Sequence, residues 1–227
     1  MKKTNLLLAA LISALLAGCG GGSDSNPVLG PTGIMNNLKS TNLDDSGSPW
    51  VGLAVGKLKL WDVNQNGLIP VKTKNISIAI QALDQIEQEL GVVIFDRTSV
   101  SNVADNLVSR GIIVSSDTAI GPGGVIDSNA CGHVSAGIGT TSFPASFYNS
   151  NGNINTVLYV HLSSAGCAAT TNIAIHEFGH ALGMGPHFAG FGIGDAIDSN
   201  FWNVLYNMYN NNVGEIESNL VITQVKF

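Results

Sequence analysis

Residues 171–187 read TNIAIHEFGHALGMGPH, and this stretch decides how the rest of the 227-residue chain is interpreted. Apolar side chains surround its polar positions on nearly every side, which predicts a buried helix over residues 171–182. His176 and His180 are four residues apart and therefore lie on one face of that helix, one turn from each other. Burying two imidazoles and the carboxyl group of Glu177 is costly unless they serve a polar centre such as a metal ion.

The pattern indicates zinc chemistry. Neutral imidazole is a common zinc ligand, and two ligands on one rigid helical turn need little further ordering. Glu177 lies beside them and can take a proton from a metal-activated water, whose pKa zinc lowers towards neutrality. The alternative is a solvated helix face that carries His176 and His180 without a metal.

The residues after the helix extend the pattern. Residues 176–187 resemble the metzincin clan of zinc metallopeptidases, whose motif is His-Glu-x-x-His-x-x-Gly-x-x-His. Gly183 stands where that clan turns the chain sharply out of the helix, a backbone shape that glycine reaches without strain. His187 comes one residue later than in the clan, and Pro186 occupies the usual position. A loop can absorb one extra residue, so His187 remains the expected third ligand.

The resemblance implies a zinc-dependent metalloendopeptidase that acts on a protein or peptide substrate. His176, His180 and His187 would hold Zn²⁺, and Glu177 would act as general base on the metal-activated water. The open alternative for the third ligand is a downstream glutamate, either Glu215 or Glu217.

The same clan places a methionine in a tight turn beneath the metal. Met208 is the downstream candidate for that Met-turn. The alternative reading of residues 201–209 is an amphipathic helix that holds Met208 in its core.

Periodicity along the chain predicts an α+β domain. The clearest helix runs from a cap at Asn75 to a left-handed stop at Gly91. Residues 58–63 and 68–73 are predicted as two strands joined by an Asn-Gly hairpin, which is favoured over a calcium loop because the closing glutamate is absent. Further strands are expected at 92–95, 111–115, 134–138 and 157–162. The resemblance implies a metzincin-like twisted mixed sheet, a long N-terminal helix, a zinc-binding active-site helix and a short C-terminal subdomain.

The N-terminus predicts export. Residues 1–18 combine a basic start with a short apolar run, which is typical of a secretory signal peptide. Leu16-Ala17-Gly18-Cys19 resembles the bacterial lipobox, which implies acyl chains on Cys19 and anchoring to a membrane of the cell envelope. The residue after Cys19 is not aspartate, which favours the outer membrane or cell surface. An ordinary signal peptide with a chance cysteine is the alternative.

The polar composition after Cys19 predicts a flexible tether over residues 19–48 and a catalytic domain over residues 49–227. Cys131 and Cys167 remain once Cys19 carries lipid, and an even pair in an oxidising compartment predicts a disulfide rather than two buried thiols. Removal of Lys2 and Lys3 with the signal leaves eight basic and sixteen acidic residues. An acidic chain argues against nucleic acid as a partner.

A second function of a different class fits the same residues. The chain could be a membrane-anchored binding lipoprotein with a structural or vestigial zinc site, which the late position of His187 favours.

Overall fold

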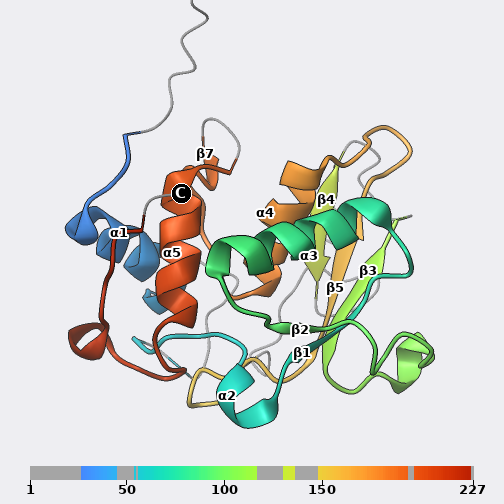
Figure 1. The fold of residues 1–227 in the computed structure, drawn as a ribbon, viewed down its shortest axis with the longest axis horizontal. Helices are drawn as coiled ribbons and strands as arrows, with labels where there is room; N and C mark the ends of the chain where they lie inside the picture. Colours follow the sequence, from blue (N-terminus) through green and yellow to red (C-terminus); the bar gives the residue numbers. More distant parts are fainter. Residues whose placement is uncertain are drawn as a thin grey trace, which may run out of the picture.

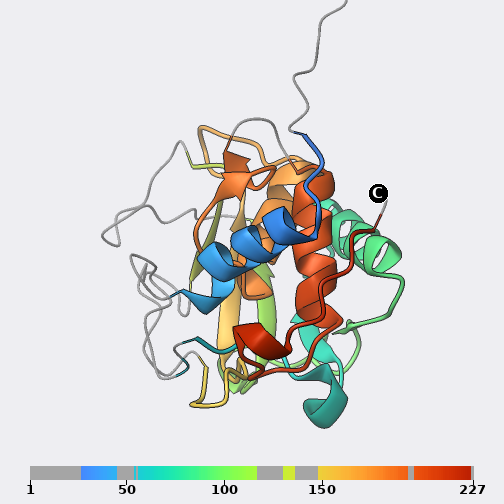
Figure 2. The ribbon, with the colours of Figure 1, turned by 90° about the vertical axis from the view of Figure 1, so that its left-hand side faces the viewer.

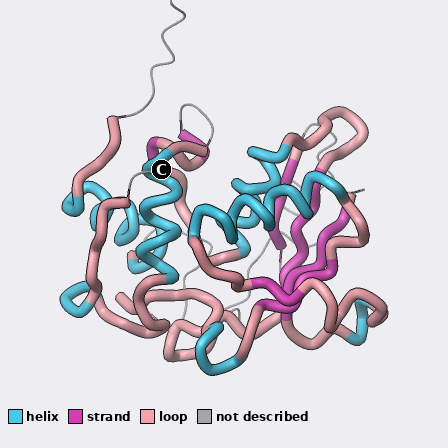
Figure 3. Tube along the Cα trace, in the orientation of Figure 1, coloured by secondary structure: helices cyan, strands magenta, loops and turns pink. Residues whose placement is uncertain are grey.

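A five-stranded mixed sheet carries the fold in the computed structural model, which describes residues 27–44, 54, 56–116, 130–135, 148–193 and 197–225. The strands are β1 (Ile69–Lys72), β2 (Phe95–Asp96), β3 (Gly111–Ser115), β4 (Gly132–Ser135) and β5 (Val157–Leu162). Their order across the sheet is β2-β1-β3-β5-β4 (Figure 3). All neighbouring pairs are parallel except β4 and β5, which are antiparallel.

Helices α3 (Ser77–Leu90) and α4 (Thr171–Ala181) pack against each other beside the sheet, and α5 (Ser199–Tyr209) lies next to α3 (Figure 1). A short N-terminal helix, α1 (Pro31–Leu38), continues into a π-helix over Lys39–Leu43. The remaining elements are short: α2 (Val63–Asn66), β6 (Phe188–Ala189), β7 (Gly192–Ile193) and two 3₁₀ turns at Asp105–Leu107 and Glu217–Asn219.

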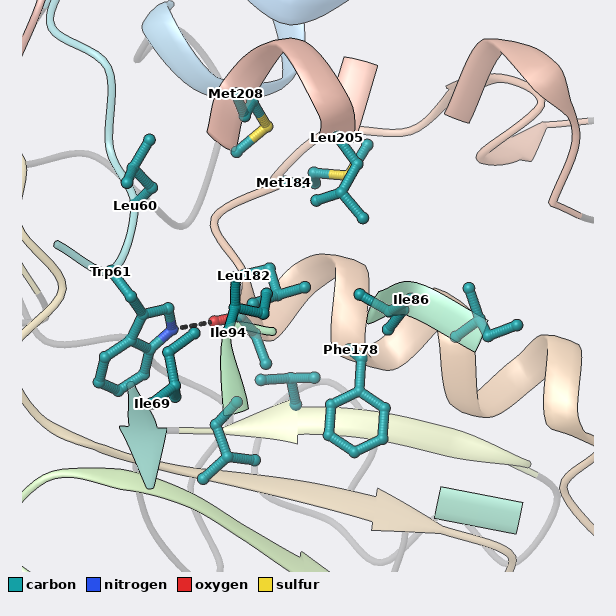
Figure 4. Packing of buried hydrophobic residues seen from close by; sticks show 14 of the residues in the cluster. Leu60, Trp61, Ile69, Ile86, Ile94, Phe178, Leu182, Met184, Leu205 and Met208 are labelled. Atoms are coloured by element: carbon teal, nitrogen blue, oxygen red, sulfur yellow. Dashed lines mark hydrogen bonds between the residues drawn. The ribbon is translucent and has the colours of Figure 1, made fainter. Parts of the chain in front are cut away.

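The core lies between the sheet and these helices. Phe178 of α4 is fully buried within the cluster drawn in Figure 4, and its ring centroid lies 6.3 Å from that of Phe95 of β2. Trp61 is also fully buried, and its indole N–H donates to the carbonyl oxygen of Ala181 at 2.8 Å. That hydrogen bond ties the chain before β1 to the end of α4, the helix that carries the predicted ligands.

The predicted mixed sheet, long helix and later helix are confirmed. β3 and β5 have the predicted bounds, and α4 ends one residue earlier than expected. Gly91 ends α3 in a left-handed conformation with φ 68°. Asn75 does not cap this helix, because it is itself left-handed with φ 59° and the helix begins at Ser77.

The predicted hairpin is wrong. Residues 63–66 form the helical turn α2, because the Asp62 side chain accepts a hydrogen bond from the Gln65 backbone N–H. Leu60 instead bridges to Asn153, and β1 pairs with β2 and β3. The Asn-Gly turn was consistent with a hairpin, but the segments before and after it pair with residues that are far away in the sequence.

The predicted strand at 92–95 is also largely wrong. Val92 and Val93 are 51% and 61% exposed, and only Phe95 of that run belongs to β2. The predicted strand at 134–138 corresponds to β4, and residues 136–138 lie outside the described part of the chain.

The predicted flexible tether over residues 19–48 is wrong where the structure describes it. Residues 31–43 are helical and pack against the domain, with α1 beside α5 (Figure 2). Ile34, Leu38 and Leu43 are buried in the common core. These three apolar residues are separated by polar ones, so the polar composition of the segment did not indicate a helix with a buried apolar face.

The C-terminal residues do not form a subdomain with a core of their own. Helix α5 contributes to the same core as α3 and α4. Asn203, Asn207 and Asn211 lie four residues apart on α5, and their side chains accept hydrogen bonds from the backbone N–H groups of Val225, Thr223 and Val221. This asparagine ladder was not predicted, and it fastens the end of the described chain along α5 (Figure 2).

Candidate metal centre

Three imidazoles converge at the end of α4. His176 and His180 come from α4, and His187 comes from the loop that follows it. Their Nε2 atoms form a nearly equilateral triangle, with separations of 3.1 Å for His176 and His180, 3.2 Å for His180 and His187, and 3.1 Å for His187 and His176. The structure therefore brings together all three histidines that the sequence predicted as ligands.

The triangle fits a single ion. Tetrahedral zinc binds histidine nitrogens at about 2.0–2.1 Å, which places two such nitrogens about 3.3 Å apart. The observed Nε2 separations lie close to that value. Three His side chains are therefore arranged as they would be around a metal ion.

The protonation of the imidazoles suits ligation. The Nδ1 atom of His180 lies 2.7 Å from the carbonyl oxygen of Met184, which can only accept, so Nδ1 carries the proton and Nε2 keeps a lone pair. Burial lowers the pKa of His176 to about 4 and that of His180 to about 3, with the neighbouring imidazoles adding to the effect. Burial also lowers the pKa of His187.

The apolar ring of Phe191 packs against all three imidazole rings. Its ring centroid lies 4.7 Å from that of His176, 4.9 Å from that of His180 and 5.4 Å from that of His187. Gly192 follows with φ 73°, and a Cβ atom there would lie 2.6 Å from His187 and 2.8 Å from His176. Glycine is required at this position because both the backbone conformation and the close approach of the rings exclude a side chain.

Glu177 lies against the edge of the sheet. Its side chain is only 8% exposed, and burial raises its pKa to about 8. Gly132 of β4 makes room for it, since a Cβ atom there would lie 2.7 Å from Glu177 Oε1. The carboxyl group is therefore held between α4 and β4, on the helical turn that carries the histidines.

The sharp exit from α4 explains how a late histidine can reach the other two. Gly183 has φ 111°, and a Cβ atom there would lie 2.4 Å from the carbonyl oxygen of Lys59. The predicted need for glycine at this turn is confirmed. His187 follows four residues later, and its side chain is the most exposed of the three ligands.

The alternative third ligands lie elsewhere. Glu217 forms an ion pair with Lys39 at 2.9 Å, and Glu215 accepts a hydrogen bond from Asn212 at 2.8 Å. Neither joins the cluster of metal-binding side chains found among the described residues. His133 and His161 face each other across β4 and β5 and also lie outside that cluster.

Met208 does not occupy a tight turn. It lies within α5, fully buried, on the side of Leu205 and Met184 (Figure 4). The predicted Met-turn is therefore wrong and the alternative of a core residue in a helix is correct. The side chain that packs against the three imidazoles is Phe191.

Cys131 and Cys167 lie within disulfide-bonding distance, with their Cα atoms 4.9 Å apart. Cys131 directly precedes β4, and Cys167 lies between β5 and α4. A bond between them links the strand beside Glu177 to the chain that enters α4.

Residues 1–26, which contain the predicted signal peptide and Cys19, lie outside the described residues. In the part of the chain that is described, no helix has the length and apolar character needed to cross a membrane. Comparison of the chain with protein-family models, with curated proteins and with solved structures found no match.

Proposed function

We propose that this chain is a zinc-dependent metalloendopeptidase. The observation that carries the proposal is the triangle of three Nε2 atoms with one exposed member, His187. Catalytic zinc sites commonly have three protein ligands and an open position, whereas structural sites are closed by four. Within the described residues the cluster has three members, and three imidazoles are a donor set that suits zinc.

The roles of the chain's own residues follow from their positions. His176, His180 and His187 would hold the ion, which when bound supplies the Lewis acidity that activates water and polarises a carbonyl group. Glu177 accepts the proton of the attacking water and passes it to the leaving amine. Burial alone raises the pKa of this carboxyl group and favours its protonated form, so the positive charge of a bound ion would be needed to keep Glu177 ionised as a base.

The sheet favours an extended peptide as substrate. Within the described residues, β4 is one of the two edge strands, and Glu177 packs against its first residue, Gly132. Extended peptides commonly bind by adding a strand to such an edge. The order of β1, α3, the later strands and α4 also agrees with the metzincin-like layout that the motif implies.

The test combines metal analysis with proteolysis. We expect the purified chain to contain one zinc ion and to cleave casein, and a chelator to abolish cleavage reversibly. Glu177→Gln is nearly isosteric and should retain zinc while turnover falls by about 10³-fold or more. Turnover at the wild-type rate in Glu177→Gln would remove this residue from the mechanism.

The burial of Glu177 favours a second candidate function. A carboxyl group that is 8% exposed has little access to a substrate. Such burial is consistent with a binding lipoprotein that has a structural or vestigial zinc site. A chain that binds zinc stoichiometrically but cleaves neither casein nor a mixed peptide library would support this candidate.

We also propose that lipid on Cys19 anchors the protein to the bacterial cell envelope, at the outer membrane or the cell surface. Incorporation of a labelled fatty acid into the wild-type chain, and its loss in Cys19→Ser, is the expected result. Labelling that persists in Cys19→Ser would contradict the anchor at this residue.

A further inference from the structure

The loop that carries His187 is held by a segment far away in the sequence. Thr41 lies in the π-helix that follows α1 and is 1% exposed. Its carbonyl oxygen accepts the N–H of Gly185 at 2.7 Å, and its hydroxyl donates to the carbonyl oxygen of Pro186 at 2.7 Å. Pro186 directly precedes His187, so the hydroxyl of Thr41 fixes the peptide unit that leads into the third ligand.

Asn42 holds the start of the same loop. Its side-chain amide donates to the carbonyl oxygen of Gly183 at 2.8 Å and to that of Lys59 at 2.7 Å. Its Oδ1 atom accepts the backbone N–H of Lys59 at 2.8 Å. The ammonium group of Lys59 donates in turn to the carbonyl oxygen of Asn42 at 2.7 Å. Both residues are buried, so these bonds are costly to break.

The segment itself is firmly attached. Ile34 and Leu38 of α1 are buried in the common core. Asn200 of α5 accepts the N–H of Leu29 at 3.0 Å and donates to the carbonyl oxygen of Pro27 at 3.2 Å. Hydrophobic and polar contacts therefore fix the segment through residues other than Thr41 and Asn42.

We infer that residues 27–43 are a clamp that positions the third metal ligand, with Thr41 and Asn42 as its contact residues. His176 and His180 need no such support because one helix holds both. His187 is itself exposed, and the loop that leads to it is one residue longer than in the related motif, so its position depends on what fixes the preceding backbone. The inference rests on the proposed metal site and adds positioning residues to it.

The test uses the full chain and the isosteric variant Thr41→Val, which keeps the shape of the side chain and removes its bond to Pro186. Thr41→Ser restores a hydroxyl. Ser40→Ala is the matched control, because Ser40 lies on the same π-helix and bonds only to the carbonyl oxygen of Asn37 among the contacts described. Zinc affinity is measured by competition with a chromophoric chelator, and hydrogen exchange of residues 184–188 is measured on the metal-free chain.

We expect Thr41→Val to weaken zinc binding about 10-fold and to speed exchange across residues 184–188 several-fold. Thr41→Ser should return both values to near wild type, and Ser40→Ala should change neither. In a His187→Ala background, Thr41→Val should have no further effect on zinc affinity, because the ligand through which the clamp acts is gone.

Two results would overturn the clamp. One is wild-type exchange and zinc affinity in Thr41→Val. The other is an equal loss of affinity in the His187→Ala background, which would indicate general destabilisation. A wild-type chain that binds no zinc would instead refute the proposed function, and the exchange measurement would still decide whether Thr41 orders the loop.

Discussion

Replacement of Asn207 by alanine should destabilise the protein by about 3 kcal/mol. Asn207 is fully buried in α5. Its amide donates to the carbonyl oxygens of Asn203 and Thr223, each at 2.7 Å, and its Oδ1 atom accepts the N–H of Thr223 at 2.7 Å. The Asn203 carbonyl keeps its helical bonding, whereas both backbone groups of Thr223 lose this partner. Each group left unsatisfied costs about 1–3 kcal/mol, and partial access of water to the exposed Thr223 keeps the sum near the lower end.

Urea denaturation of metal-free wild type and variant, followed by circular dichroism, measures this difference. Asn210→Ala is the matched control, because Asn210 is exposed directly after the same helix and should change the free energy of unfolding by less than about 0.5 kcal/mol. A loss below about 1 kcal/mol in Asn207→Ala, or an equal loss in Asn210→Ala, would refute the view that the asparagine ladder fastens the C-terminal segment.

Three further predictions concern the metal centre. Gly192→Ala places a Cβ atom within 2.8 Å of two ligand rings and should weaken zinc binding about 100-fold in a chelator competition; unchanged affinity would contradict this packing. Gly132→Ala places a Cβ atom 2.7 Å from Glu177 Oε1 and should lower turnover on casein at least about 10-fold at full zinc content, whereas normal turnover would show that the carboxyl group can move freely. Burial holds the pKa of His180 at about 3, so between about pH 6.5 and 3 the unfolded chain binds more protons at this residue. The metal-free chain should therefore lose stability as the pH falls below 6.5. Urea denaturation at pH 7.5 and at pH 5 measures this loss, which should be smaller by about 2 kcal/mol in His180→Gln than in the wild type. An equal loss in the two chains would contradict the lowered pKa of His180.

The sequence was most informative where the decisive interactions are local. Helical spacing alone places His176 and His180 on one turn of α4, because the pitch of a helix sets that geometry wherever the helix lies. Gly91 and Gly183 were recognised for the same reason, since a left-handed or similarly strained backbone is a property of single residues. Apolar runs located β3 and β5 because β3 is buried on both faces, and β5 is buried on one face and partly buried on the other.

Local patterns failed where distant partners compete for the backbone. An Asn-Gly turn between two apolar runs predicted a hairpin, yet β1 pairs in parallel with strands that come later in the chain. Met208 resembled a Met-turn by position, but only the packing of α5 shows that it is a core residue and that Phe191 lies under the imidazoles.

By itself, the sequence determined the helix with two candidate metal ligands, the acid beside them and the glycine that ends the turn. Only the tertiary structure decided that His187 completes the triangle and that residues 27–43 belong to the folded unit. The physical reason is the range of the contacts: Thr41 and Pro186 are 145 residues apart in the chain, and no periodicity or spacing encodes a hydrogen bond across that separation. Such contacts form only after the core has brought α1, α4 and α5 together.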